Sequence, residues 1–216
     1  MKLFVIADIH GALDPFDRGR DIIRRCDAVV IAGDLCRRGK PADAMKVIKK
    51  VESINRTIIA VPGNWDPAPV MEMLEEKGYS VHASSKRMND IAFFGCGGAP
   101  KSLLRTPTMF TEAQISAFLD EAHKGITGVP KKVLVTHVPP RGLMDRSMFR
   151  MHLGSSAVRE FIDRNRPLCI VCGHVHEAAG VELYGNVNVI NPGSFRMGKY
   201  CIVTIDDSIT VHAGVM

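Results

Sequence analysis

Short apolar runs alternate with amphipathic stretches along most of the chain. The run at residues 28–32 is apolar throughout, which is typical of a strand. Within residues 41–53, Ala44, Val47, Ile48 and Val51 recur at the spacing of one helix face. The pattern predicts strands at residues 2–7, 28–32, 57–61, 91–95, 133–136 and 168–172, and helices at residues 15–25, 41–53, 71–77, 111–124 and 155–165.

The pattern changes towards the end of the chain. Residues 181–183, 187–190, 200–205 and 209–212 are short apolar runs joined by Gly, Asn and Asp, as in antiparallel hairpins. Alternating strands and helices followed by hairpins favour mixed sheets with helices outside. No repeat, low-complexity segment or linker interrupts residues 1–216, so we expect a single domain. Residues 96–110 and 138–154 are expected to be two long loops, and loops of this length in a compact domain usually have a function.

Composition narrows the class of protein. An apolar share of 46% and a charged share of 24% are typical of a globular chain with a substantial core. No apolar stretch approaches the roughly 18 residues of a membrane span, and the apolar start is too short for a signal peptide. We therefore expect a cytoplasmic protein without a membrane partner. The net charge of +5 suits an anionic substrate but does not argue for extensive nucleic-acid binding.

Six cysteines have no spacing that suggests a disulfide framework, and a cytoplasmic chain would keep them reduced. Cys169 and Cys172 form a C-x-x-C pair inside an apolar run. Residues three apart on a strand point to opposite faces, so these two thiols cannot chelate one metal ion. We expect both to be packing residues.

Polar residues of one chemical kind follow five of the predicted strands. In open α/β sheets, ligands bind outside the carboxyl ends of the strands, so these five loops are expected to converge. Each motif alone is common, whereas all five in succession at strand ends are not a chance pattern. The residues concerned are Asp8 with His10, Asp34, Asn64 with Asp66, His137, and His174 with His176.

These residue types suit divalent metal ions. Imidazole with carboxylate or amide oxygen selects Mn, Fe, Co, Ni or Zn, and the lack of a thiolate excludes a closed structural zinc site. Seven side chains are too many for one ion and suit two ions with one shared carboxylate. Two divalent ions bring four positive charges, and the carboxylates of Asp8 and Asp34 neutralise two of them. A hydroxide and a phosphate ester would neutralise the remaining charge of about two. The sequence therefore predicts a phosphoester hydrolase that uses a metal-bridging hydroxide as nucleophile.

The ordered motifs Asp8-x-His10, Gly33-Asp34, Gly63-Asn64-x-Asp66, His137 and Gly173-His174-x-His176 resemble the calcineurin-like metallophosphoesterase superfamily. The resemblance spans residues 8–176 and is closest to small single-domain members. It implies a four-layer αββα sandwich of two mixed β-sheets flanked by helices, with manganese as the favoured metal. It also implies a ligand set: Asp8, His10 and His176 for one ion, Asn64, His137 and His174 for the other, and Asp34 as the bridge.

Trp65 departs from the family pattern, in which many members have His at this position. That His stabilises the transition state or protonates the leaving oxygen, and an indole N–H does not titrate. General acid catalysis contributes about 10²–10⁴-fold, so its loss matters most for poor leaving groups. Some relatives without this His resemble phosphodiesterases. Trp65 either contacts a substrate ring or packs over the metals, and Asp66 is expected to orient the Asn64 loop.

His152, in the second long loop, is our candidate to replace the missing His by contacting phosphate or the leaving group; the alternative is an exposed loop residue. The same loops contain further candidate phosphate ligands, because Arg binds phosphate in a bidentate manner. These candidates are Arg141, Arg146 and Arg150 in one loop, and Lys101 and Arg105 in the other.

The sequence therefore favours a phosphodiesterase that acts on a small nucleotide-like substrate. A phosphomonoesterase or a nucleotide pyrophosphohydrolase is the alternative within enzymes, and a nuclease is weaker because the chain has no room for a DNA-binding domain. A catalytically weak protein-binding scaffold is the alternative from another class. The complete set of seven ligand residues argues against the scaffold. The sequence is compatible with a homo-oligomer.

Overall fold

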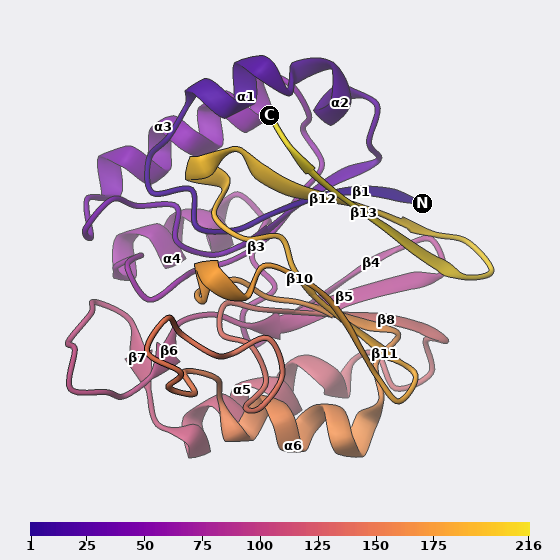
Figure 1. Ribbon diagram of the computed structural model, residues 1–216. Helices are drawn as coiled ribbons and strands as arrows, with labels where there is room; N and C mark the ends of the chain where they lie inside the picture. Colours follow the sequence, from indigo (N-terminus) through magenta and orange to yellow (C-terminus); the bar gives the residue numbers. More distant parts are fainter.

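The apolar runs form the strands of two β-sheets that pack face to face in the computed structural model, which describes residues 1–216 (Figure 1). The first sheet has the order Ile209–Val215 (β13), Lys199–Ile205 (β12), Lys2–Ile6 (β1), Ala28–Ala32 (β2) and Ile58–Val61 (β3). The second has the order Gly180–Tyr184 (β10), Val187–Asn191 (β11), Cys169–Val171 (β9), Lys131–Thr136 (β8), Ile91–Cys96 (β5) and Ser85–Met88 (β4). A small third sheet pairs Ala99–Pro100 (β6) with Met109–Phe110 (β7).

Both large sheets are mixed. In the first, β1, β2 and β3 are parallel, and the β12–β13 hairpin adds antiparallel to β1. In the second, β5, β8, β9 and β11 are parallel, and β4 and β10 are antiparallel edge strands. The predicted fold, two mixed sheets with helices outside, is therefore confirmed.

Helices cover the outer face of each sheet (Figure 1). The helices on the first sheet are Asp14–Arg18 (α1), Arg20–Arg24 (α2), Pro41–Glu52 (α3) and Ala68–Glu76 (α4). Those on the second sheet are Glu112–Lys124 (α5) and Ser156–Asn165 (α6). Helix α5 begins with a capping box, in which Thr111 and Gln114 are bonded reciprocally. Short 3₁₀ turns at His176–Ala178 (η1) and Phe195–Met197 (η2) complete the chain.

Three apolar cores hold the four layers together. Leu3 and Val5 of β1 point into the core between the sheets, while Phe4 and Ile6 point into the core under α1 to α4. Because both faces of the central strands are covered, β1 and β2 are continuous apolar runs rather than alternating ones. Burial of one such side chain contributes about 1.5–3 kcal/mol, so these strands are firmly anchored where the loops leave them.

Tertiary contacts change two features of the sequence prediction. The helix expected at residues 15–25 is divided at Gly19 into α1 and α2, and Gly19 packs against the side chain of Met216, where a Cβ would collide. Strand β4 was not predicted, because its polar residues lack an apolar alternation. Exposed charged side chains are common on such an edge strand.

All six cysteines are buried and free. Cys169 lies in the core between the sheets, whereas Cys172 lies in the core under α5 and α6. The two thiols therefore point to opposite faces of the sheet, as predicted, and both are packing residues. None of the helices has the length and apolar character needed to cross a membrane.

Candidate metal centre

The loops after β1 and β2 continue side by side beyond the ends of their strands. The backbone N–H of Asp8 donates to Gly33 (3.0 Å), and the N–H of His10 donates to Asp34 (2.9 Å). The N–H of Gly11 then donates to the carbonyl of Leu35 (2.9 Å). This ladder brings the side chains of Asp8 and His10 beside Asp34, although the two loops are separated by a helical segment.

A glycine precedes three of the candidate ligands because the loops approach too closely for a side chain. A Cβ on Gly33 would meet the ring of His137, and a Cβ on Gly63 would overlap Asp34. A Cβ on Gly173 would lie 2.5 Å from the Cβ of Ala7 and 2.7 Å from a carboxylate oxygen of Asp8. The glycine directly before the ligand in each of these motifs therefore allows the ligand loops to pack closely around one site.

Four candidate ligands have left-handed backbones, a region that non-glycine residues rarely occupy. Their φ values are 54° for Asp8, 48° for His10, 57° for Asp34 and 68° for His174. Each such residue costs of order 1–3 kcal/mol, and strain of this kind concentrates at functional sites. The fold therefore holds these four side chains in place at the expense of stability.

One group of donor atoms comes from Asp8, His10 and His176, whose ligating atoms lie within 4.8 Å of one another. Nε2 of His176 is 3.2 Å from Oδ1 of Asp8. Nδ1 of His10 lies 3.1 Å from the carbonyl oxygen of Cys36, which can only accept, so Nδ1 carries the proton. Nε2 of His10 is left with a free lone pair, 3.7 Å from Oδ2 of Asp34.

A second group comes from Asn64, His137 and His174. Oδ1 of Asn64 lies 2.8 Å from Nε2 of His137 and 3.0 Å from Nδ1 of His174. Nδ1 of His137 donates to the carbonyl of Ala32 (2.8 Å), so its Nε2 also keeps a lone pair. That Nε2 is 3.6 Å from Oδ1 of Asp34, and Asp8, Asp34 and His137 form a further set within 4.8 Å.

The donor set fits divalent cations. Lone pairs of His10 and His137 face the two carboxylate oxygens of Asp34 at distances beyond a hydrogen bond, an arrangement that a cation between them would stabilise. Burial and the nearby carboxylates of Asp66 and Asp8 raise the pKa of Asp34 well above its usual range. Burial and the neighbouring His137 lower the pKa of His174 to about 3, so its ring is neutral and free to bind a metal.

Asp66 holds the two loops that carry Asp34 and Asn64. Its carboxylate accepts from the backbone N–H groups of Leu35 (3.0 Å), Cys36 (2.7 Å) and Gly63 (2.8 Å). Asp66 is fully buried. It therefore orients the loops, as predicted from the sequence.

Trp65 contributes to the site through its backbone and its ring. Its N–H donates to Oδ1 of Asp34 (2.8 Å), which fixes the carboxylate. Trp65 is half-buried and lines a cavity of about 460 Å³ together with His10 and His176. Trp65 therefore lies beside the donor groups. This position is compatible with both predicted roles, contact with a substrate ring and packing over the metal ions.

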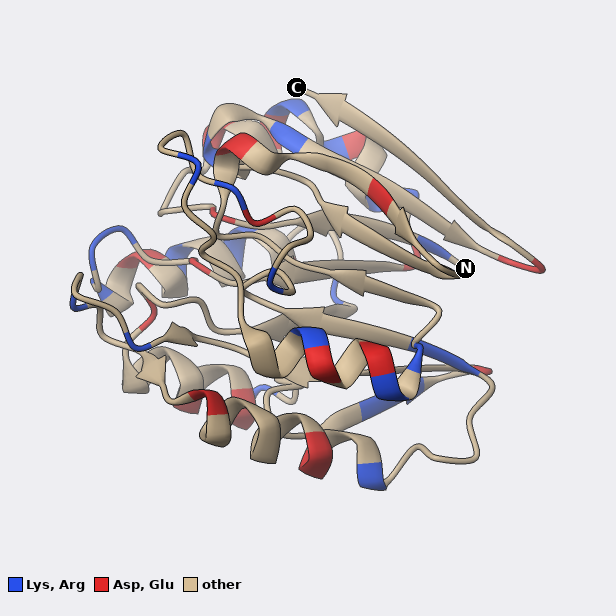
Figure 2. Cartoon of the chain, turned by 60° about the horizontal axis from the view of Figure 1, so that its bottom comes forward, with Lys and Arg blue, Asp and Glu red and all other residues tan.

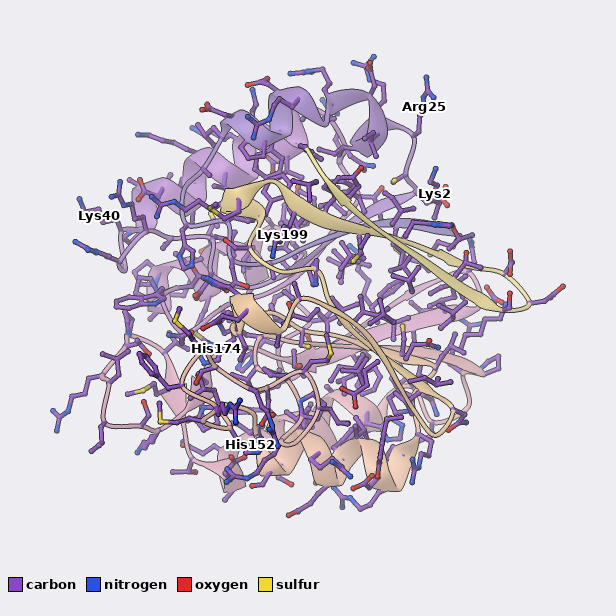
Figure 3. The ribbon with its side chains drawn as sticks, viewed as in Figure 1. Lys2, Arg25, Lys40, His152, His174 and Lys199 are labelled. Atoms are coloured by element: carbon purple, nitrogen blue, oxygen red, sulfur yellow. The ribbon has the colours of Figure 1, made fainter.

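The two long loops behave differently from expectation. Nδ1 of His152 lies 2.7 Å from Oδ1 of the buried Asp145, within its own loop. Figure 3 shows His152 below His174 in the view, towards α6. Neither His152 nor any of the five predicted phosphate ligands lines the cavities beside His10. Arg146 lines a separate hollow with Asp145 and Glu182. The proposed contact of His152 with substrate stays a prediction.

The sequence reasoning missed four cationic residues that do lie beside the donor groups. Arg37, Arg38 and Arg196 line both cavities next to His10, and Lys40 lines one of them. Figure 2 shows Lys and Arg positions on the loops at the left, near the carboxyl ends of the parallel strands. The available signal was the position of Arg37 and Arg38, three and four residues after Asp34.

The segment that carries Arg196 crosses from the second sheet to the first. The side chain of Asn191 donates to the carbonyl of Val175 (2.9 Å) on one side. On the other side, the hydroxyl of Ser194 donates to the carbonyl of Asp8 (3.0 Å). Residues 191–194 thus join the His174 loop to the Asp8 loop, and they fix the start of Arg196 beside Asp8.

Comparisons with known proteins identify the family of the chain. The sequence matches the calcineurin-like phosphoesterase superfamily domain over residues 1–208. An uncharacterized protein of Methanocaldococcus jannaschii is 31% identical over 203 residues, which are 89% of this chain and 88% of the relative.

Two solved structures share the fold at low sequence identity. A dimetal phosphatase from Danio rerio is 14% identical, with a TM-score of 0.68 over 99% of this chain and 95% of that one. A novel archaeal phosphodiesterase is 19% identical, with a TM-score of 0.60 over 100% of both chains. Because the family match spans nearly the whole sequence, the chain belongs to the calcineurin-like phosphoesterase superfamily.

Proposed function

We propose that this metal-dependent phosphoesterase hydrolyses phosphodiesters of small nucleotide-like compounds. In this proposal, Asp8, His10 and His176 hold one divalent ion, and Asn64, His137 and His174 hold another. Asp34 would bridge them; Mn is the metal we propose, and Fe, Co, Ni and Zn are alternatives that the same nitrogen and oxygen donors suit.

The observation that carries the proposal is the orientation of Asp34. Its Oδ2 faces Nε2 of His10, and its Oδ1 faces Nε2 of His137, at 3.7 and 3.6 Å. A carboxylate whose oxygens face two separate groups of nitrogen donors has the geometry of a bridging ligand. The N–H of Trp65 and the buried position restrain this carboxylate, so it is already oriented before a metal binds.

When bound, a pair of divalent ions supplies an activated water at neutral pH and stabilises the charge of an in-line displacement at phosphorus. The residues of the chain then have separate tasks. The carbonyls of Cys36 and Ala32 fix the tautomers of His10 and His137, as outer partners of metal ligands commonly do. Asn64 presents an amide oxygen to two imidazoles and would also contact the phosphate.

Trp65 supports the choice of a diester. The indole cannot donate a proton to a leaving oxygen, so esters with good leaving groups or a single negative charge suit the site better. The ring at the rim of the cavity could stack on a nucleobase or sugar. A phosphomonoesterase is the alternative, and both readings share the same metal ligands.

The experiment is hydrolysis of bis(p-nitrophenyl) phosphate and of p-nitrophenyl phosphate, with Mn, Ni, Co or no metal. We expect metal-dependent release of nitrophenol with a higher kcat/KM for the diester. Faster hydrolysis of the monoester would reject the diester preference while keeping the metal centre. No hydrolysis of either compound with any metal would reject the enzyme and favour the protein-binding scaffold.

A further inference from the structure

A basic hollow lies directly beside the donor groups. It has a volume of about 530 Å³, and its lining includes Arg37, Arg38, Lys40, Arg196 and His10. The adjacent cavity has a volume of about 460 Å³ and is also lined by Arg37, Arg38, Arg196 and His10. Its lining includes Trp65 and His176 as well. Because the two cavities share these lining residues, the cationic side chains lie beside the metal ligands His10 and His176.

These four cations have no carboxylate partner. None of them forms a salt bridge, although cationic side chains elsewhere in the chain do, such as Lys77 with Glu52 (2.8 Å) and Lys131 with Asp90 (2.9 Å). Asp43 is the one carboxylate that lines the basic hollow, and it is not within ion-pair distance of any of them. Like charges around one hollow repel each other, and an anion in the hollow would relieve this repulsion.

The backbones of the arginines are fixed to the ligand loops. Arg37 follows Cys36, whose N–H donates to Asp66 and whose carbonyl accepts from His10. Arg38 has a left-handed backbone with φ of 51°. On the opposite side, the N–H of Arg196 donates to the carbonyl of Asp8 (3.3 Å). The cations therefore start from defined positions on either side of the site.

The charge at the metal centre does not require these arginines. Two divalent ions with Asp8 and Asp34 leave an excess of about two positive charges, which a hydroxide and a singly charged diester neutralise. Four additional cations exceed what the scissile phosphate needs. They call for a second anionic group on the same substrate. Guanidinium groups suit a phosphate in particular, because they bind it in a bidentate manner.

We propose that Arg37, Arg38, Lys40 and Arg196 form a subsite for a second, uncleaved phosphate, and that the substrate is a phosphodiester bearing an additional phosphate group. This inference rests on the proposed function, since it places the cleaved ester at the metal ligands. It narrows the substrate class from diesters in general to small phosphorylated diesters.

The test compares the dinucleotide ApA with its terminally phosphorylated form pApA, and counts only cleavage of the internucleotide bond with Mn. We expect the kcat/KM for pApA to exceed that for ApA by about tenfold or more, as a charged hydrogen bond allows. Arg37→Gln and Arg196→Gln each reduce this ratio several-fold. Arg25→Gln is the control, because Figure 3 shows Arg25 at the opposite end of the molecule from Lys40.

A ratio near one in the wild type, or a ratio that survives both arginine substitutions, would overturn the subsite. Failure of the proposed function has a different signature, namely no cleavage of either dinucleotide. In that case, calorimetric titration of pApA and ApA into the wild type and Arg196→Gln decides the question. Tighter binding of pApA that is lost in the variant supports the subsite, and equal binding of the two compounds overturns it.

Discussion

The hydroxyl of Ser194 donates to the backbone carbonyl of Asp8 across 3.0 Å, although 186 positions separate the two residues in the sequence. Asp8 has a left-handed backbone, and both groups are buried. The bond therefore holds a strained ligand loop in position from the segment that links the two sheets.

Ser194→Ala is expected to lower the free energy of unfolding by about 1–3 kcal/mol, because the carbonyl of Asp8 loses a buried partner. It should also weaken Mn binding, since Asp8 is no longer held. Denaturant unfolding and Mn titration measure the two effects. Ser208→Ala, in an exposed turn, is the control and should change neither quantity. Unchanged Mn affinity in Ser194→Ala would contradict the role of this bond.

Asp66→Asn tests the loop-orienting carboxylate. The amide keeps the size of the side chain but replaces one acceptor oxygen with a donor, which then faces a backbone N–H. We expect a loss of about 1–3 kcal/mol for each donor left without a partner, and a lower affinity for metal. Thermal unfolding with and without Mn measures both. A variant with wild-type stability and metal content would show that Asp66 does not hold these loops.

The ligand loops could be predicted from the sequence because each motif directly follows an apolar run, and parallel strands bring such ends to one edge. Arg37 and Arg38 had a signal in the sequence, because they follow Asp34 by three and four residues, whereas no motif beside Arg196 indicates that it reaches the site. The path of Arg196 is set by the crossover from β11 to β12, which no local pattern encodes.

His152→Ala tests whether this loop histidine acts on the leaving group. Its pairing with Asp145 would hold the ring in one orientation, as a carboxylate does for a proton-donating imidazole. We expect a decrease of roughly tenfold or more in kcat on aryl diesters with poor leaving groups, and little change with good ones. Equal rates to the wild type on both kinds of ester would remove His152 from the mechanism. His212→Ala, on the exposed edge strand β13, is the control.

Buried thiols make stability depend on pH at the alkaline end. Burial raises the pKa of Cys201 to about 11, from an ordinary value near 9. Above pH 9 the unfolded chain loses this proton while the folded chain keeps it, so the free energy of unfolding falls by about 1.4 kcal/mol per pH unit for this group. Urea unfolding between pH 8 and roughly 11 measures the slope. Cys201→Ala should have a shallower slope, and an identical slope would contradict the prediction.

The bridging carboxylate is the centre of the proposed chemistry, and Asp34→Asn tests it most directly. The substitution keeps the shape of the side chain but removes the charge that two ions would share. Elemental analysis and hydrolysis of bis(p-nitrophenyl) phosphate are measured on the same preparation, with Asp163→Asn on the surface of α6 as control. We predict two Mn ions per chain and activity in the wild type and control, and loss of metal together with activity in Asp34→Asn. Two retained ions with normal turnover would contradict a bridging role for Asp34.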